Sequence, residues 1–255
     1  MAESSILTKA MALMDRITEA RSPLTLPEIT EITGWPRSSV HRLLVLLRDA
    51  DALSYDPERQ TYSPGSRLMR WGVRTQTRDN IAMRAAPHMR TLCRDTNMRV
   101  ALSVPDGQSV LFVHTEELGA PFRLAPRLGE HSPLHVTAGG KLFLSEMSDA
   151  ARKDLLADYE LELCTEFTIT DADRLAAHLE QVRRDGYATS LREEFRQICG
   201  IAVPIRDDRG RLLAALSLWT VSDEGGDDLE MLQALLPQAT QAASAIQTNI
   251  GHKGT

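Results

Sequence analysis

The chain has 255 residues, of which 42% are apolar and 25% are charged, and its formal net charge is −6. This length allows one large domain or two ordinary ones, and the composition is typical of a globular protein. No apolar run approaches the length that a membrane-spanning helix needs, and residues 1–20 lack the features of a secretion signal. We therefore expect a cytoplasmic protein without a membrane partner.

Charge is distributed unevenly along the chain. Residues 1–100 carry 15 Lys and Arg against 11 Asp and Glu, whereas residues 101–255 carry 14 against 24. A basic front and an acidic rear are consistent with a module that faces nucleic acid, joined to a module that binds a ligand or a partner.

A helix is expected near the start of the chain, because apolar residues recur there at three- and four-residue steps. They are Ile6, Leu7, Ala10, Leu13, Met14 and Ile17. A second helix is predicted to begin after Thr25, whose spacing to Glu28 is that of a capping box. Gly34 can adopt the left-handed conformation that ends a helix, and Pro36 suits the first position of a third helix.

The third helix, within RSSVHRLLVLLRD, combines an apolar stripe with a polar first turn. The stripe consists of Val40, Leu43, Leu44 and Leu47. A helix that enters the major groove uses its N-terminal turns for base edges and phosphates, while its later turns pack on neighbouring helices. The residues that we expect at DNA, including the cap and the following loop, are Thr25, Arg37, Ser38, Ser39, His41, Arg42 and Arg59.

Two short β-prone stretches follow, Leu53–Tyr55 and Thr61–Ser63, around a polar loop. Three helices followed by such a hairpin predict a winged helix-turn-helix. The alternative is a small helical domain whose basic residues are only a solvated face. Few helix breakers occur in 66–96, so this segment is expected to form one or two linking helices.

The remainder predicts an α+β domain built on an antiparallel sheet, because strand pairs are interrupted by helices without regular alternation. The expected strands are Arg99–Val104, Ser109–His114, Pro121–Ala125, Tyr187–Leu191, Gly200–Arg206 and Leu212–Val221. The expected helices are Ala138–Glu146, Ala150–Asp158, one from a capping box of Thr170 and Asp173 to near Gly186, and one long helix over Asp227–Ile250.

No motif of an enzyme active site, metal site or nucleotide-binding loop occurs in the sequence. The three cysteines are Cys93, Cys164 and Cys199. They lie far apart without zinc-ligand spacing, so we expect reduced, mostly buried thiols and no cofactor. Glu193 and Glu194 are adjacent, and we interpret them as surface charge. Cys199 could act with His135 as nucleophile and base only if the fold brought them together.

The most informative stretch of the second module is LGEHSPLHVTAGGKLFLS, which places small residues at the start of a helix. Free N–H groups and the helix dipole at such an end favour a carboxylate or phosphate. The alternative is that Gly139 and Gly140 only allow close helix packing. His135 is expected to cap or pack rather than to bind a ligand.

Three blocks of the chain resemble the IclR family of bacterial transcription regulators. LPEITEITGWPRSSVHRLL is similar to its helix-turn-helix, PLHVTAGGKLFLS to its effector-domain signature, and DGYATSLREE with GIAVPIRDDRGRLLAALSL to its C-terminal blocks. The blocks span nearly the whole chain in the family's order. The resemblance implies a winged helix-turn-helix over 1–65, a linker helix over 66–80 and a GAF-like effector-binding and oligomerisation domain over 81–255.

The resemblance also implies an effector pocket between the sheet and the glycine-containing helix, which takes small carboxylates or aromatics. The effector-binding residues that it indicates here are Ala138, Gly139, Ser190, Ile198, Gly200, Ser217 and Trp219. The chain departs from the family where Gly200 follows a displaced Cys199 and where Trp219 replaces a small residue. A tryptophan changes pocket volume and adds a stacking face. Arg123, Arg192 and Arg196 are further candidates for pairing an anion.

These patterns together predict a ligand-responsive transcription regulator that binds a pseudopalindromic operator in double-stranded DNA as a homodimer or a dimer of dimers. It is expected not to be an enzyme. Two alternatives remain open from the residues alone: an enzyme that turns over a small acid in the α+β domain, and a protein-interaction module that uses the same domain.

Overall fold

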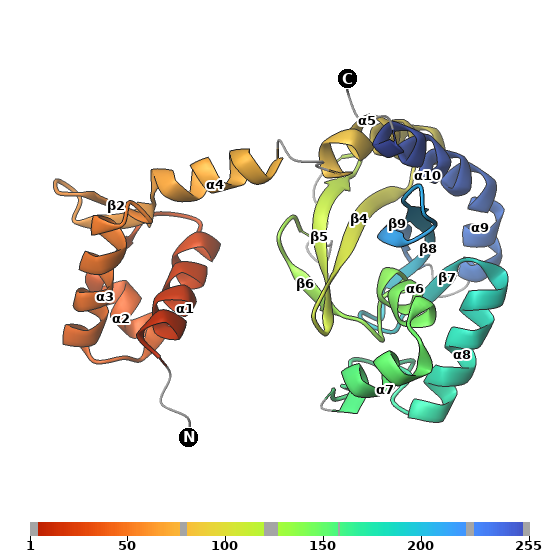
Figure 1. The fold of residues 1–255 in the computed structure, drawn as a ribbon, viewed down its shortest axis with the longest axis horizontal. Coiled ribbons are helices and arrows are strands. Elements are labelled where there is room, and N and C mark those ends of the chain that lie inside the picture. Colours follow the sequence, from red (N-terminus) through yellow and green to blue (C-terminus); the bar gives the residue numbers. More distant parts are fainter. Residues whose placement is uncertain (1–4, 77–80, 120–126, 158, 223–226, 252–255) are drawn as a thin grey trace. The chain divides into compact units, whose positions relative to one another are not determined.

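The computed structural model describes residues 5–76, 81–119, 127–157, 159–222 and 227–251 (Figure 1). The chain divides into two compact units, Met1–Asn80 and Ile81–Thr255. Each unit encloses buried apolar side chains of its own, so each is described by itself.

The N-terminal unit is a helix-turn-helix with a wing and a trailing helix. Its helices are α1 (Ile6–Glu19), α2 (Leu26–Thr33), α3 (Arg37–Asp49) and α4 (Ser66–Gln76). Its strands are β1 (Leu24–Thr25), β2 (Leu53–Asp56) and β3 (Thr61–Pro64). The strands form one antiparallel sheet in the order β1-β3-β2, in which β2 and β3 are the predicted hairpin.

The predicted turn between α2 and α3 is confirmed with one correction. The N–H of Thr25 donates to Glu28 Oε2 at 2.7 Å and the N–H of Glu28 donates to Thr25 Oγ1 at 3.5 Å, which is the capping box. Gly34 ends α2 at φ 65°, in the left-handed region. Pro36, expected as the first helical residue, is instead the N-cap of α3, and its carbonyl accepts from Val40 N–H at 3.1 Å.

The core of this unit joins α1, α2, α3 and the wing. Its buried side chains are Leu13, Met14, Ile17, Ile29, Val40, Leu43, Leu44, Ala52, Leu53 and Tyr62. Helix α3 contributes three of them at helical spacing, so packing fixes one stripe of this helix. The opposite stripe of α3 is therefore open to solvent.

The C-terminal unit is an α+β fold around one antiparallel sheet of six strands, ordered β6-β5-β4-β9-β8-β7. The strands are β4 (Arg99–Asp106), β5 (Ser109–Glu116), β6 (His131–Pro133), β7 (Ala188–Leu191), β8 (Ile198–Arg206) and β9 (Leu212–Val221). The helices are α5 (Ile81–Thr96), α6 (Ala138–Glu146), α7 (Asp149–Ala157), α8 (Ala172–Asp185), α9 (Asp228–Ala234) and α10 (Leu236–Gly251).

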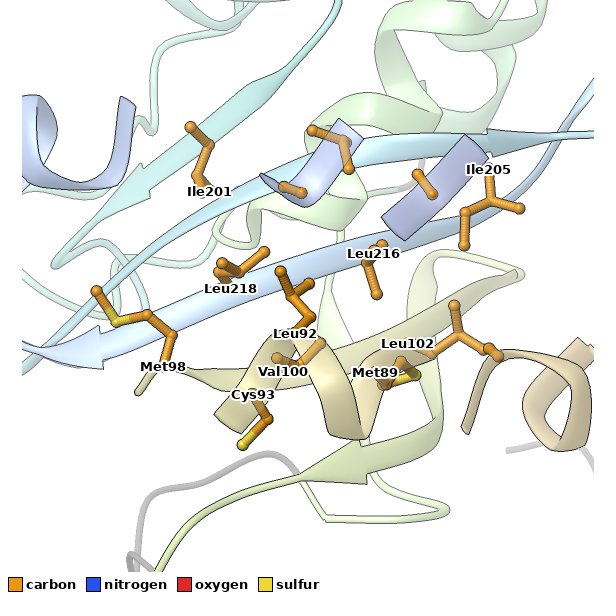
Figure 2. Close-up of a cluster of buried hydrophobic side chains, with 14 of the residues drawn as sticks. Met89, Leu92, Cys93, Met98, Val100, Leu102, Ile201, Ile205, Leu216 and Leu218 are labelled. Carbon is orange, nitrogen blue, oxygen red and sulfur yellow. The ribbon is translucent and has the colours of Figure 1, made fainter. Parts of the chain in front are cut away.

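Helices cover both faces of this sheet. On one face α5, α9 and α10 pack on alternate strand residues, and Figure 2 shows Met89 and Leu92 of α5 beside Val100 of β4 and Leu218 of β9. On the other face α6 contacts β7, β8 and β9, and α8 packs against α6 (Figure 1). Successive strand residues point to opposite faces, so each strand serves both cores.

Two predicted helix boundaries in this unit are wrong. The helix expected over Asp227–Ile250 is broken into α9 and α10, because Pro237 lacks an N–H and its ring disfavours helix in the turn before it. The expected cap pair of Thr170 and Asp173 is replaced by Asp171, which accepts from Arg174 N–H at 2.8 Å. Helix α8 ends at Gly186, close to where its end was predicted, and Gly186 lies in the left-handed region at φ 74°.

Two further expectations concern the periphery of the fold. The strand expected over Pro121–Ala125 lies outside the described residues. Among the helices that the structure describes, none has the length and apolar character required to cross a bilayer.

Candidate DNA-binding surface and ligand pocket

The open side of α3 carries the polar residues that the sequence singles out. Arg37, Ser38, His41 and Arg42 are exposed and Ser39 is half-buried, whereas Val40 between them is fully buried. Helix α3 is thus held by its apolar stripe and presents donors from its first two turns. Hydroxyl, imidazole and guanidinium groups are the donors that reach base edges and phosphates in the major groove.

The other two predicted DNA-contacting residues flank this helix in sequence. Arg59 is exposed in the turn between β2 and β3, where its N–H donates to Asp56 Oδ1 at 3.1 Å. The hydroxyl of Thr25 is engaged with Glu28 Oε2 at 2.7 Å, so Thr25 already has a structural role as a helix cap.

The C-terminal unit contains a pocket between the sheet and the start of α6. The space, counted together with its open mouth, is about 510 Å³, within the range of small-molecule sites. The residues that line it are Ala101, Ser103, Val110, Phe112, Val136, Thr137, Ala138, Gly139, Ser190, Glu194, Ile198, Gly200, Ser217 and Trp219. The walls are mainly apolar and the polar groups are few.

All seven residues that the resemblance indicated for effector binding line this one pocket. They come from α6, β7, β8 and β9, elements spread over residues 138–221 that the fold brings together. Sequence reasoning missed seven other lining residues, among them Ser103 and Glu194. Ser103 could have been suspected because it interrupts an apolar strand at an inward-facing position, and Glu194 because it ends the block DGYATSLREE that carries the resemblance.

The start of α6 provides hydrogen-bond donors to the pocket. Thr137 is the N-cap, and its hydroxyl accepts from Gly140 N–H at 3.1 Å. The N–H groups of Ala138 and Gly139 belong to the first turn, where no carbonyl of the same helix can reach them. Both residues line the pocket, so an anion there would meet two N–H donors and the positive end of the helix dipole.

The alternative interpretation of the two glycines of α6, that they allow close packing, also holds. A Cβ on Gly140 would lie 2.2 Å from the carbonyl oxygen of Leu134, and a Cβ on Gly139 would lie 2.7 Å from Ser103 Oγ. Gly140 is therefore required by backbone packing. Gly139 lies over a side chain within the pocket, so it serves both purposes.

Hydroxyl groups from the sheet lie beneath this helix end. Ser103 Oγ is buried and has no hydrogen-bond partner among the described residues. Ser217 Oγ would lie 3.7 Å from a Cβ on Gly139, whereas Ser190 Oγ donates to the Val136 carbonyl at 2.5 Å. A buried hydroxyl without a partner is unusual, which marks Ser103 as a group poised for a ligand.

His135 packs beside the pocket without lining it. It is fully buried, with Nδ1 2.7 Å from Tyr159 Oη and Nε2 3.1 Å from the Glu162 carbonyl oxygen. Burial lowers the pKa of His135, so the neutral ring joins these two groups. This structural role agrees with the expectation that His135 packs rather than binds a ligand.

The interpretation of Glu193 and Glu194 as surface charge is wrong. Glu193 is 6% exposed and accepts a hydrogen bond from Nζ of Lys141, which is fully buried on α6. Lys141 Nζ also donates to the Thr189 carbonyl at 3.0 Å. Burial raises the pKa of Glu193 and lowers that of Lys141, while their mutual attraction opposes both shifts. The pair ties α6 to the β7–β8 loop.

Glu194 is the acidic residue among those that line the pocket. Burial raises its pKa and the negative charge of Glu130 adds to this, whereas a hydrogen bond with Ser132 opposes it. The two neighbouring glutamates therefore have different roles, one in an ion pair behind the wall and one in the wall itself.

The remaining nucleophile and anion-pairing candidates lie elsewhere. Cys199 belongs to the core on the α10 side of the sheet, and burial raises its pKa to about 11, the opposite of what a thiolate nucleophile needs. Arg192 stacks over the Phe167 ring at 4.4 Å, and Arg196 pairs with Glu166 at 3.0 Å. Arg123 lies outside the described residues.

His178 on α8 gives a pH-dependent prediction. Burial and, next, the charge of Lys141 lower its pKa to about 4, below the ordinary value of 6.5. Between these values the unfolded chain binds the proton and the folded chain does not, so stability falls as the pH decreases. A fully buried ring would lower the free energy of unfolding by about 1.4 kcal/mol per pH unit as the pH decreases. The ring is partly exposed, so we expect about half of this slope, about 0.7 kcal/mol per pH unit, for wild type relative to His178→Gln. Urea unfolding of both proteins at pH 7, 6 and 5 measures this slope. A difference in stability between wild type and His178→Gln that stays constant with pH would contradict the prediction.

Two family models match the chain. The one described as "Bacterial transcriptional regulator IclR C-terminal" matches residues 73–248, and the one described as "IclR helix-turn-helix domain" matches residues 6–57. Together they account for both units.

Individual relatives agree with these matches. The HTH-type transcriptional regulator BhcR of Paracoccus denitrificans is 31% identical over 236 residues, covering 92% of this chain and 82% of BhcR. The crystal structure of the Thermotoga maritima IclR superposes with a TM-score of 0.75 at 26% identity, covering 96% of this chain and 98% of that one. The inducer-binding domain of a PobR double mutant from Acinetobacter was solved with 3-hydroxybenzoic acid. It superposes with a TM-score of 0.60 at 26% identity, covering 65% of this chain and 97% of that domain.

Proposed function

The chain belongs to the IclR family of bacterial transcriptional regulators, and we propose that a small organic acid in the α6 pocket controls its binding to operator DNA. Residues 1–65 are assigned to DNA binding, 66–80 to a linker helix, and 81–255 to effector binding and oligomerisation. The acid binds with its carboxylate at the N–H groups of Ala138 and Gly139. One relative that was solved with 3-hydroxybenzoic acid supports this effector class.

The observation that carries DNA binding is the division of α3 between a buried and an exposed side. Val40, Leu43 and Leu44 are buried, while Arg37 and Arg42 are exposed on the same helix. Such a helix can enter the major groove without losing its packing. Ser38, Ser39 and His41 complete the surface that we assign to base edges and phosphates, and Arg59 on the wing and Thr25 at the cap are assigned to the flanking backbone.

We further propose that the regulator works as a homodimer or dimer of dimers on a pseudopalindromic operator in the cytoplasm. Exposed apolar side chains on α1 and α4 support pairing of the DNA-binding units, since a second copy would remove them from water. They are Ile6, Leu7, Met11, Met69, Trp71 and Val73. The effector acts by binding one arrangement of the paired units more tightly than the other, because equal affinity for both would shift nothing.

Catalysis is not part of this proposal. The pocket binds an acid through hydrogen bonds, and the pKa of the Cys199 thiol, at about 11, disfavours nucleophilic attack. Incubation of the protein with each acid, followed by chromatography of the small molecules, should recover them unchanged. A new product would favour the enzyme alternative.

The first experiment is a gel shift of the full-length protein on the DNA upstream of its own gene. It is run without addition and with propionate, lactate, pyruvate, benzoate or 3-hydroxybenzoate. We expect a specific complex, displaced by excess unlabelled upstream DNA and changed by at least one acid. No specific complex under any condition would contradict the proposed function.

The DNA-binding surface yields its own prediction. We expect Arg42→Ala to weaken binding to the upstream DNA roughly tenfold and Ser39→Ala about threefold, because each removes one polar contact. Arg48→Ala is the matched control, since Arg48 lies in the last turn of α3 and pairs with Asp49 at 3.0 Å. Fluorescence anisotropy at several salt concentrations measures the affinities. Arg42→Ala and Ser39→Ala variants that bind like the control would remove α3 from the interface.

A further inference from the structure

Arg206 links helices that cover opposite faces of the sheet in the C-terminal unit. Its guanidinium donates to the carboxylate of Glu146, the last residue of α6, from Nη2 at 2.6 Å and from Nη1 at 3.1 Å. Its backbone N–H donates to Gln247 Oε1 on α10 at 2.7 Å. Because α6 and α10 pack on different faces of the sheet, this one residue at the end of β8 is bonded to both helix layers.

An irregularity in the sheet makes the backbone of Arg206 available to α10. The register between β8 and β9 shifts between Ile205 and Arg206, so that Leu212 rather than Leu213 is opposite Arg206. An extra residue of this kind disrupts the regular ladder of hydrogen bonds and bends the strand locally. Gln247 accepts from the N–H of Arg206 at this position, so the shift in register is what joins the strand end to α10.

Helix α6 joins this link to the pocket. Its first residues, Ala138 and Gly139, line the pocket, and its last residue, Glu146, is paired with Arg206. Residues 138–145 are all buried, and a closely packed helix shifts as a unit, so a ligand that displaces the start of α6 also displaces Glu146. The side chains of Glu146 and Arg206 are 35% and 32% exposed, so this pair breaks at less cost than a buried one.

Helix α10 continues the link to α5. In the last turn of α10, the Asn249 carbonyl accepts from the guanidinium of Arg84, and Asn249 Nδ2 lies 2.7 Å from His88 Nε2. Both partners belong to the first two turns of α5. This helix is the first of the C-terminal unit, and only residues 77–80 separate it in the sequence from α4. The contacts therefore run from the pocket end of α6 to the helix that follows the DNA-binding unit in the chain.

We propose that Arg206 couples the α6 pocket to α5 through Gln247 and Asn249, so that binding of an effector changes the position of α5. Arg206 is not among the pocket-lining residues that the structure describes, so it is a positioning residue that acts through its neighbours. Such coupling needs an element with two arrangements that both sites favour unequally, and α6 with its breakable pair at Glu146 is that element. This inference rests on the proposed function and adds the residue through which the pocket acts on α5.

The connection is tested first without a ligand, by amide hydrogen exchange of the full-length protein. Arg206→Met removes the pair with Glu146, so exchange in residues 85–92 of α5 should become about threefold faster although Arg206 is bonded to α6 and α10. Arg211→Met is the matched control, because Arg211 lies in the same turn and its guanidinium pairs with Asp207 at 2.7 Å. Exchange in α5 that is equal in the two variants would overturn the connection.

The coupling itself is measured by fluorescence anisotropy. The affinity of the full-length protein for its upstream DNA is determined without addition and with saturating propionate, lactate, pyruvate, benzoate or 3-hydroxybenzoate. Coupling between two sites typically changes an affinity by about 5- to 150-fold. We expect Arg206→Met, and independently Gln247→Met, to reduce the wild-type ratio of affinities to about twofold or less. Calorimetry should give affinities of these variants for the acid within about twofold of wild type, and Arg211→Met should keep the full ratio.

The possible outcomes separate this inference from the proposed function. Arg206→Met with the wild-type ratio of affinities would overturn the inference while leaving an acid-responsive regulator. Arg206→Met with an equal loss of affinity for the acid would also overturn it, because Arg206 would then act on the pocket alone. A wild type that binds DNA equally with and without every acid would overturn the proposed function. Thermal melting verifies that each variant folds.

Discussion

Lys141→Met is expected to destabilise the protein by about 3–5 kcal/mol, the typical cost of removing one partner from a buried ion pair. The fully buried Lys141 donates to Glu193 and to the Thr189 carbonyl at 3.0 Å, so the substitution leaves both acceptors without that donor. Glu193 Oε2 already lacks a partner among the described residues. The loss is a large part of the about 5–15 kcal/mol that stabilises a typical domain.

Urea unfolding followed by circular dichroism measures this change. Lys153→Met, at an exposed lysine on α7, is the matched control and should change stability by less than about 0.5 kcal/mol. Adding Glu193→Gln to Lys141→Met should recover about half of the loss, because the buried charge is removed. A Lys141→Met variant as stable as the control would contradict the prediction and show that the pair with Glu193 does not stabilise the fold.

Gly139→Val is expected to lower the affinity for every acid that wild type binds by roughly 100-fold, since overpacking and lost N–H contacts each cost about 1–3 kcal/mol. The Cβ alone would lie 2.7 Å from Ser103 Oγ and 3.2 Å from Ala215 Cβ. The two added methyl groups would occupy the space where the carboxylate is placed. Calorimetry with 3-hydroxybenzoate and lactate measures the loss.

Gly139→Ala provides a graded comparison. The Ser103 hydroxyl can rotate away from one methyl group, so Gly139→Ala should bind about tenfold more weakly than wild type. The double variant Gly139→Ala with Ser103→Ala relieves the contact but also removes the proposed donor, so it should not regain affinity. Normal binding by a folded Gly139→Val variant would exclude the start of α6 from the effector site.

The helix-turn-helix was largely predictable because its signals are local. The reciprocal hydrogen bonds of Thr25 and Glu28, the positive φ of Gly34 and the apolar spacing of α3 each depend on a few adjacent residues. The break between α9 and α10 was missed although its signal, Pro237, is also local, because the amphipathic pattern continues across it.

The pocket was predictable only in part. Its seven nominated residues came from a resemblance, and they meet because β7, β8 and β9 are neighbours in the sheet beneath α6. Ser103 lies on β4, which pairs with β9 so that Ala101 is opposite Ser217. These positions are more than 100 residues apart in the chain, so the periodicity of the sequence does not predict their pairing.

By itself the sequence determined the class of both units and the exposed face of α3, since helix caps and apolar periodicity are properties of adjacent residues. Only the tertiary structure decided which charged groups around the pocket are buried and how they are paired. Glu193 and Glu194 are interpreted as surface charge from the sequence, yet Glu193 is buried in a pair with Lys141 and Glu194 is one of the residues that line the pocket. The physical reason is that burial of a charge depends on a partner supplied by a distant segment, here the β7–β8 loop against α6.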